Sequence, residues 1–199
     1  FAKLGINVIG IPATIDNDIV YTQSIGFDTA VNTVLGAINR IRDTATSHGR
    51  VFIIEVMGRD CGEIALAAGV AGGAESILIP EIETDINQIV DKINRGHLRG
   101  KTHSIILVAE GVYPVMELKD RIQEMTGHDT RVTILGHIQR GGTPTAVDRI
   151  LASCMGKMAV DLIAEGKRNL MVAGNEQKIF TIPLQEIING TRTPELSMF

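Results

Sequence analysis

Short apolar runs alternate with longer amphipathic stretches along most of this chain. Five of the runs have the length and β-branched content of strands that are buried on both faces of a sheet. These predicted strands are Ile6–Ile11, Val51–Val56, Ser76–Ile79, Ser104–Ala109 and Arg131–Leu135.

The stretches between the runs have helical periodicity and predict helices over residues 25–46, 61–72, 85–99, 115–126 and 144–165. In the first of them a single stripe contains the apolar residues Val31, Val34, Leu35, Ile38 and Ile41.

Several residues are of types that begin or end helices. Asp85 is a candidate N-cap, and Gly100 and Gly166 follow predicted helices, where C-terminal glycines belong. The tail after Leu170 has a less regular pattern, in which residues 179–182 fit a strand and 183–188 a short helix.

The regular exchange of strands and helices predicts an α/β fold, with doubly wound, mostly parallel sheets and helices on both faces. The 199 residues suffice for one large α/β domain or two small interlocked ones. In open sheets of this kind ligands bind beyond the carboxyl ends of the strands. Polar residues that directly follow a predicted strand are therefore the candidates for chemistry.

The composition is that of an ordinary globular protein, with 44% hydrophobic and 21% charged residues. The net charge of −4, with no basic block, argues against binding to nucleic acid or to an anionic membrane. No apolar run reaches the roughly 18 residues that a membrane helix needs. The two cysteines, Cys61 and Cys154, lack CxxC or metal-ligand spacing, which indicates a reduced, cytoplasmic protein without a disulfide.

A polar cluster follows the first predicted strand. Thr14, Asp16 and Asp18 alternate with Ile15 and Asn17, so that an extended segment would point the three polar side chains to one side. A carboxylate there could accept the proton of an attacking sugar hydroxyl, and a second could help to hold Mg²⁺. The competing interpretation is a turn, in which Asp and Asn bond to the local backbone.

The second cluster, Met57-Gly58-Arg59-Asp60-Cys61-Gly62, follows the strand Val51–Val56. Backbone N–H groups and the Arg59 guanidinium could face an anion together, although a tight turn with a solvated Arg is equally compatible. Arg50 lies at the opposite end of the same strand, so that it would bind ligand only from a neighbouring subunit.

Two more clusters follow later strands. Glu110 comes directly after Ala109, where a lone Glu is more often a solvated loop residue. His137 and Arg140 lie beside Gly141-Gly142 and could clamp a phosphate, or could be exposed polar residues of a glycine-rich loop.

A basic group precedes one of the predicted strands. It consists of Arg99, Lys101 and His103, and by residue type alone it is a solvated helix end.

Together the clusters resemble the ATP-dependent 6-phosphofructokinases of the bacterial type. The resemblance covers the whole chain and rests on PATIDND, SHGRVFIIEVMGRDCG, VAEG, TRVTILGHIQRGG and TPTAVDRILA, in this order. It implies a glycolytic kinase that transfers the γ-phosphate of ATP to the 1-hydroxyl of fructose 6-phosphate, with Mg²⁺ as cofactor. It also implies a two-domain fold of which this chain holds part. Residues 1–26 and 139–188 would belong to the ATP-binding domain, and 27–138 and 189–199 to the fructose 6-phosphate-binding domain.

The resemblance assigns roles position by position. Asp16 would be the general base, Thr14 would lie beside the transferred phosphoryl group, and Asp18 would help to place Mg²⁺. Arg59, with the backbone at Met57 and Gly58, would lie by the sugar and stabilise the developing charge, as a third catalytic residue. The residues that would bind fructose 6-phosphate are Thr14, Asp16, Met57, Gly58, Arg59, Glu110, His137 and Arg140, with Arg50 and Arg131 reaching in from the adjacent subunit of a homotetramer. The effector site, for ADP as activator and phosphoenolpyruvate as inhibitor, would contain Arg42, Glu75, Arg99, Lys101 and His103.

The sequence departs from the family pattern in one region. It starts at Phe1, without Met or the layout of a signal peptide, and lacks the glycine-rich nucleotide loop expected upstream. We therefore expect that it begins partway through a larger protein and that these 199 residues alone are inactive.

Two alternatives stay open. Pyrophosphate-dependent relatives commonly carry Lys where this chain has Ala13, and Ala cannot supply that charge, which favours ATP as donor. A non-catalytic, sugar-phosphate-sensing homologue would have the same fold, but it would be expected to lack the base that Asp16 supplies.

Overall fold

The computed structural model describes residues 1–175, 177–190 and 192–196, which fold into two compact units. Unit 1 comprises residues 1–29 and 143–193, and unit 2 comprises residues 30–142 and 194–199. Within unit 1, the N–H groups of Gly26 and Thr29 donate hydrogen bonds to the Asp148 carboxylate.

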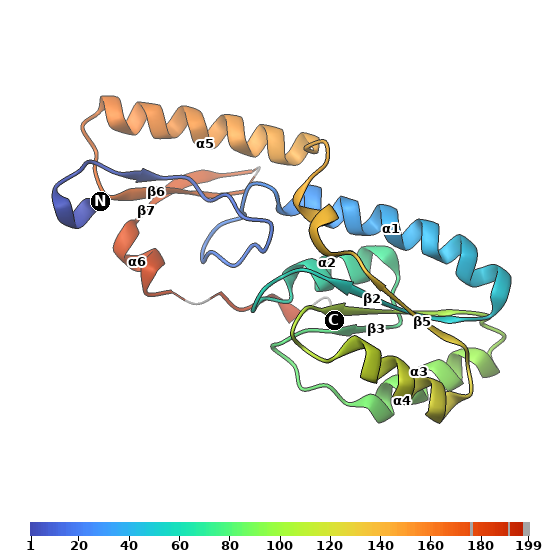
Figure 1. The fold of residues 1–199 in the computed structure, drawn as a ribbon. Coiled ribbons are helices and arrows are strands. Elements are labelled where there is room, and N and C mark those ends of the chain that lie inside the picture. Colours follow the sequence, from blue (N-terminus) through green and yellow to red (C-terminus); the bar gives the residue numbers. More distant parts are fainter. Residues whose placement is uncertain (176, 191, 197–199) are drawn as a thin grey trace. The chain divides into compact units, whose positions relative to one another are not determined.

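Unit 1 contains a three-stranded sheet between two helices (Figure 1). The strand order is β1-β6-β7, with β1 parallel to β6 and β6 antiparallel to β7. Val172 packs with α5 on one face, and its neighbours Met171 and Ala173 pack with α6 on the other. The elements are η1 (Ala2–Leu4), β1 (Ile9–Gly10), α5 (Ala146–Ala164), β6 (Leu170–Gly174), β7 (Ile179–Pro183) and α6 (Leu184–Ile188).

Two predictions about unit 1 were wrong. The predicted strand Ile6–Ile11 is reduced to Ile9–Gly10, because β1 is an edge strand and, within the described residues, has β6 as its one partner in the sheet. The stretch from Leu170 to Gly174, which was not predicted as a strand, is the central strand β6. Hydrogen bonding to β1 on one side and β7 on the other stabilises this strand, and these partners are not visible in its own short sequence.

Unit 2 contains a parallel sheet of order β3-β4-β2-β5 with helices on both faces (Figure 1). Helices α3 and α4 bury Ile53 and Ile106 on one face, and α2 lies on the other, where Gly69 closely approaches Ile77. The elements are α1 (Phe27–His48, of which residues 27–29 belong to unit 1), β2 (Val51–Val56), α2 (Glu63–Gly72), β3 (Ser76–Leu78), α3 (Ile86–Leu98), β4 (Ser104–Ala109), α4 (Val115–Thr126), β5 (Thr130–Ile134) and η2 (Gly136–Arg140). The predicted α/β fold with mostly parallel sheets and helices on both faces is confirmed.

The predicted helix ends are confirmed where a side chain or a glycine sets them. The Asp85 carboxylate accepts hydrogen bonds from the N–H groups of Asn87 and Gln88 and so caps α3. Gly100 and Gly166 follow α3 and α5 with φ of +85° and +71°, a conformation that costs glycine little.

The parallel register brings three strand ends of unit 2 to one edge of the sheet. Val56 of β2 is opposite Ala109 of β4, and Glu55 is opposite Ile134 of β5. Met57, Glu110 and the start of η2 therefore follow neighbouring strands at the same edge, where open α/β sheets bind ligands.

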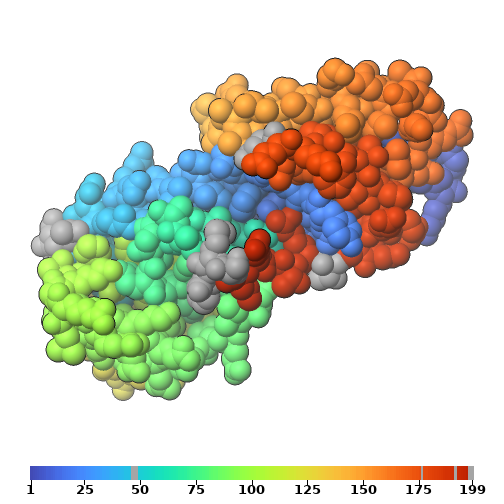
Figure 2. All heavy atoms as spheres, turned by 180° about the vertical axis from the view of Figure 1, so that it is seen from behind, coloured from blue at the N-terminus to red at the C-terminus, as the bar shows by residue number. Residues whose placement is uncertain are grey.

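The outer surface of α5 is exposed and is coloured orange in Figure 2. Ile150, Val160 and Ile163 of this helix are each more than half exposed.

Among the helices in the described part of the chain, none combines the length and the apolar character that crossing a bilayer requires.

Candidate functional site

In unit 1, Thr14 and Asp16 lie together at a tight turn. The Thr14 hydroxyl donates to Asp16 Oδ2 at 3.4 Å, and the Asp16 N–H donates to Thr14 Oγ1 at 3.2 Å. Asp16 is only 5% exposed, and Asp18 is half-buried. The expected extended segment was wrong, because the chain turns at Ile15-Asp16 and Asn17 takes the left-handed conformation with φ +54°.

The segment that follows this turn fixes its position. The Ser24 N–H donates to Asn17 Oδ1 at 2.9 Å, and the Ile25 N–H donates to the Pro12 carbonyl at 3.0 Å. Asn17 is itself 2% exposed and is of a residue type that tolerates the left-handed region. The carboxylate of Asp16 is thus held in a preformed, nearly water-free position.

In unit 2, side chains that follow β4 and β5, the two strands beside β2, hold three consecutive backbone N–H groups. The Met57 N–H donates to Gln139 Oε1 at 3.1 Å, while the Gly58 and Arg59 N–H groups donate to Glu110 Oε1 at 3.2 and 2.9 Å. The N–H groups of Gly58 and Arg59, which the sequence suggested for an anion, here face the carboxylate of Glu110.

This loop also sets the position of Arg59. Arg59 has φ +54° and is exposed. Gly58 has φ +156°, and a Cβ at this position would lie 2.4 Å from the Cys61 carbonyl oxygen, so that the loop requires glycine here. The strained backbone and the two side-chain clamps present exposed Arg59 at the edge of the sheet where the parallel strands end.

A second carboxylate, Glu55, is associated with this edge. Burial raises the pKa of Glu55 above its ordinary value of 4.5, and the charge of Glu110 raises it further. A raised pKa favours the neutral acid in the folded protein, so that stability contributed by Glu55 is present below pH 4.5 and is lost as the pH rises through the folded-state pKa.

We therefore expect Glu55→Gln to stabilise the protein at neutral pH, because the amide removes an ionised group that the fold disfavours. The gain should disappear below pH 4.5, where both Glu55 and the amide are neutral. Urea unfolding of the two proteins at neutral and acid pH measures this difference, with Glu124→Gln on the exposed side of α4 as control. An equal gain at both pH values would contradict the role of ionisation.

His137 and Arg140 lie on the 3₁₀ helix η2, and both are exposed. Residues three apart eclipse one another on a 3₁₀ helix, so that these two phosphate-binding candidates share a face. Gln139 lies between them in sequence but is buried, with 1% of its surface exposed. The geometry is suited to gripping a phosphate, since both residues can direct N–H donors to one anion.

At the opposite edge of the same sheet, Arg50 and Arg131 converge on Asp129. Arg50 Nε lies 2.7 Å from Asp129 Oδ2, and Arg131 Nη2 lies 3.1 Å from the same oxygen. Desolvation would raise the pKa of Asp129, but the hydrogen bonds and charges of the two arginines outweigh it and lower the pKa. The six residues of β2 separate this cluster from Met57–Arg59, about 20 Å at strand spacing.

The predicted effector residues lie around two hollows of unit 2. Glu75, Arg99 and Lys101 line an open hollow with the basic residues Lys92 and Arg95, and the Lys101 ammonium pairs with the Glu75 carboxylate. Arg42 is on α1 and lines neither hollow; its guanidinium donates to the Gly72 carbonyl at the C-terminal end of α2.

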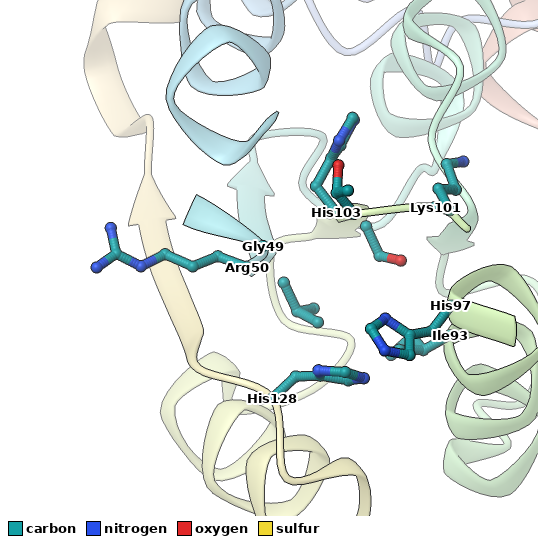
Figure 3. Close-up of a pocket in the computed structure, with 10 residues that line it drawn as sticks. Gly49, Arg50, Ile93, His97, Lys101, His103 and His128 are labelled. Carbon is teal, nitrogen blue, oxygen red and sulfur yellow. The ribbon is translucent and has the colours of Figure 1, made fainter. Parts of the chain in front are cut away.

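Lys101 also lines a smaller pocket, together with the fifth effector candidate, His103 (Figure 3). His97 and His128 face one another in this pocket, with their ring centroids 4.7 Å apart. Arg50 extends away from the two rings. The pocket therefore adds two histidines that the sequence did not single out.

Several residues of these sites were missed by sequence reasoning. Gln139 and Asp129 are neighbours of predicted site residues, but only the fold shows what they bind. Cys61 is buried and Cys154 exposed, and neither is part of a disulfide. Within the described residues there is no group of three His, Cys, Asp or Glu side chains that could hold a metal ion on their own.

Comparison with known proteins places these features in a family. The model of the family described as Phosphofructokinase matches residues 1–163. An ATP-dependent 6-phosphofructokinase from Natranaerobius thermophilus is 53% identical over 199 residues, which are 100% of this chain and 62% of that protein. The chain thus spans less than two thirds of the length of this relative.

Solved structures show the same likeness. A structure of phosphofructokinase from Saccharomyces cerevisiae matches with a TM-score of 0.87 and 39% identity, over 92% of this chain and 26% of the other. A pyrophosphate-dependent phosphofructokinase from Marinobacter aquaeolei matches with a TM-score of 0.84 and 27% identity, over 98% of this chain and 56% of the other.

Proposed function

The chain belongs to the phosphofructokinase family, and from this premise we propose that it is part of an ATP-dependent 6-phosphofructokinase. The enzyme would transfer the γ-phosphate of ATP to the 1-hydroxyl of fructose 6-phosphate, giving fructose 1,6-bisphosphate and ADP. The observation that carries the proposal is the Thr14–Asp16 pair, in which the Asp16 side chain is buried. All 199 residues of the chain align with an enzyme of this name.

Asp16 is assigned the role of general base. The carboxylate accepts the proton of the sugar 1-hydroxyl as the oxygen attacks the γ-phosphorus, and the bond from phosphorus to the β–γ bridging oxygen breaks with ADP as leaving group. Thr14, whose hydroxyl reaches Asp16 at 3.4 Å, is placed to orient that carboxylate and to lie beside the transferred group. The buried position of Asp16 excludes water, which would compete for the phosphoryl group.

Asp18 is assigned to Mg²⁺, and its half-buried carboxylate fits that role. In sites of this kind Mg²⁺ is held by one or two carboxylates together with substrate phosphates and water, so that a cage of three protein ligands is not required. The metal would neutralise charge on the phosphate oxygens as the phosphoryl group moves.

The residues at the ligand-binding edge of unit 2 are assigned to fructose 6-phosphate. Exposed His137 and Arg140, on one face of η2, suit the 6-phosphate. Arg59 is placed to counter charge that develops in the transition state, and Glu110 to accept hydrogen bonds from sugar hydroxyls when it is not holding the loop.

The remaining parts of the proposal concern assembly and regulation. Arg50 and Arg131 lie at the far edge of the sheet from their own chain's sugar-phosphate loop, which supports their action on a neighbouring subunit of a homotetramer. The basic hollow at Arg99 and Lys101 supports an effector site for anions such as ADP or phosphoenolpyruvate. A cytoplasmic location accords with the sequence, in which cysteines are few.

The donor is proposed to be ATP rather than pyrophosphate. The relative named for ATP is 53% identical to this chain, whereas the pyrophosphate-dependent structure is 27% identical. Ala13 also favours ATP as donor, because its side chain has no ammonium group to bind an additional phosphate. A non-catalytic sensor is disfavoured by the intact Asp16.

The proposal is tested by assaying the protein that contains this chain with fructose 6-phosphate and either ATP or pyrophosphate. Formation of fructose 1,6-bisphosphate with ATP alone supports the proposed reaction. Turnover with pyrophosphate alone would reassign the donor, and binding of fructose 6-phosphate without turnover from either donor would indicate a sensor.

We expect Arg131→Ala to weaken fructose 6-phosphate binding by about tenfold, because a charge-assisted contact to phosphate is lost. Binding calorimetry measures the change, with Arg40→Ala on the exposed side of α1 as control.

Mixed oligomers test whether Arg131 acts on the neighbouring subunit. An Arg131→Ala chain retains Asp16, and an Asp16→Asn chain retains Arg131, so that hybrids would contain some sites with both residues intact. Activity of the mixture above the sum of the two variants is expected. Activity no greater than that sum would place Arg131 in the site of its own chain.

A further inference from the structure

Gln139 connects the two segments of unit 2 to which sugar-phosphate binding is assigned. Its Oε1 accepts the Met57 N–H at 3.1 Å, and its Nε2 donates to the Gly136 carbonyl at 3.0 Å. One side chain thus bonds to the loop after β2 and to the first turn of η2. With 1% of its surface exposed, it does this out of reach of bulk water.

The position of Gln139 on η2 determines where its neighbours point. On a 3₁₀ helix residues three apart lie on one face, so that His137 and Arg140 share a face that Gln139 does not occupy. Anchoring Gln139 in the interior therefore fixes the rotation of this short helix. Such a helix has few internal hydrogen bonds with which to hold its own orientation.

The loop after β2 depends on the same residue. Its N–H groups at Gly58 and Arg59 are held by Glu110, a residue assigned to the substrate, whereas the N–H of Met57 is held by Gln139. When Glu110 turns to a ligand, the Gln139 contact is the one of these bonds that can stay in place.

We propose that Gln139 is a positioning residue for the binding of fructose 6-phosphate. It fixes the position of the loop Met57–Arg59 relative to the helix η2 before the ligand binds. This role rests on the proposed function. Gln139 does not contact the reacting atoms in the proposed mechanism; it acts through the backbone of Met57 and Gly136 on the side chains that do.

The two hydrogen bonds can be removed together or one at a time. Gln139→Met keeps the length of the side chain and removes both. Gln139→Glu keeps an acceptor for the Met57 N–H and, when its carboxyl is ionised, has no donor for Gly136, so that this variant is measured at a pH where the carboxylate is ionised. A control, Asn175→Leu, removes amide-to-backbone bonds of the same kind in the β6–β7 turn, where the Asn175 Oδ1 accepts from the N–H groups of Gln177 and Lys178.

The experiment measures the Kd for fructose 6-phosphate by calorimetry and the hydrogen exchange of the Met57 amide by NMR, in the whole protein. Gln139→Met is expected to raise the Kd about tenfold and to speed exchange at Met57, because a buried donor loses its partner. Gln139→Glu should keep Met57 protected and still raise the Kd, since η2 loses its anchor. Asn175→Leu should leave both quantities unchanged.

The outcomes separate this role from the proposed function. A wild-type protein that does not bind fructose 6-phosphate overturns the proposed function, and the positioning role with it. Normal wild-type binding, with a Kd in Gln139→Met within twofold of the wild type, overturns the positioning role alone. If Gln139→Met does not fold, the Kd of Gln139→Glu decides in the same way.

Discussion

Replacement of Asp16 by Asn is expected to lower turnover by about 10²–10⁴-fold, the usual contribution of a general base. The amide has nearly the same shape as the carboxylate and can still accept the hydrogen bond from the Thr14 hydroxyl. It cannot accept a proton from the sugar hydroxyl. The substitution thus separates the basicity of this position from its geometry.

The measurement is kcat in the protein that contains this chain, at saturating ATP and fructose 6-phosphate, with the KM for the sugar phosphate determined alongside. We expect KM to change little, because the binding contacts are assigned to other residues. The midpoint of unfolding should not fall, since a buried amide costs less to desolvate than a buried carboxylate. A fall in kcat below tenfold would show that Asp16 is not the base.

A matched control is available on α5. Asp161 is exposed and pairs with Lys157 one turn earlier, so that Asp161→Asn makes the same chemical change outside the site. It should leave kcat unchanged. A comparable loss in both variants would indicate an effect of net charge rather than of the base.

The sequence predicted the elements whose signals are local. The strand Val51–Val56, the helix Val115–Thr126 and the Asp85 cap all depend on residues close in sequence, and all were found where the pattern placed them. The strand β6 was missed because its stability comes from partners on both sides that are distant along the chain.

Within the candidate site, the sequence identified residue types but not their partners. The spacing of Thr14 and Asp16 suggested that their side chains would converge, and they do, but through a turn rather than an extended strand. The clamps at Met57–Arg59 could not be foreseen, because Glu110 and Gln139 lie more than 50 residues away in sequence. Such contacts are fixed by strand order and register, which a single sequence does not state.

Asp148 is a further residue that the sequence did not single out, and its loss should destabilise the protein strongly. Its two carboxylate oxygens accept from the N–H groups of Gly26 and Thr29, each at 2.8 Å, and from the Thr29 hydroxyl. The side chain is 2% exposed. Asp148→Ala would leave buried donors without an acceptor, and we expect a loss of about 3 kcal/mol in the free energy of unfolding.

Urea unfolding measures this loss, and two variants make it specific. Asp148→Asn keeps one acceptor oxygen and should lose less than Asp148→Ala. Asp161→Ala removes an exposed carboxylate from the same helix and should have no measurable effect. A loss in Asp148→Ala no greater than that in Asp161→Ala would contradict the importance of the buried acceptor.

The same substitution should also affect the turn that contains Thr14 and Asp16. The segment that Asp148 holds at Gly26 continues from Ile25, which pairs with Ala13 and donates its N–H to the Pro12 carbonyl. Asp148→Ala should therefore speed hydrogen exchange at the Ile25 amide, and kcat should fall at temperatures where the protein is still folded. Unchanged exchange at Ile25 would mean that the turn bearing Asp16 is held without Asp148, by the Asn17–Ser24 contact and its immediate surroundings.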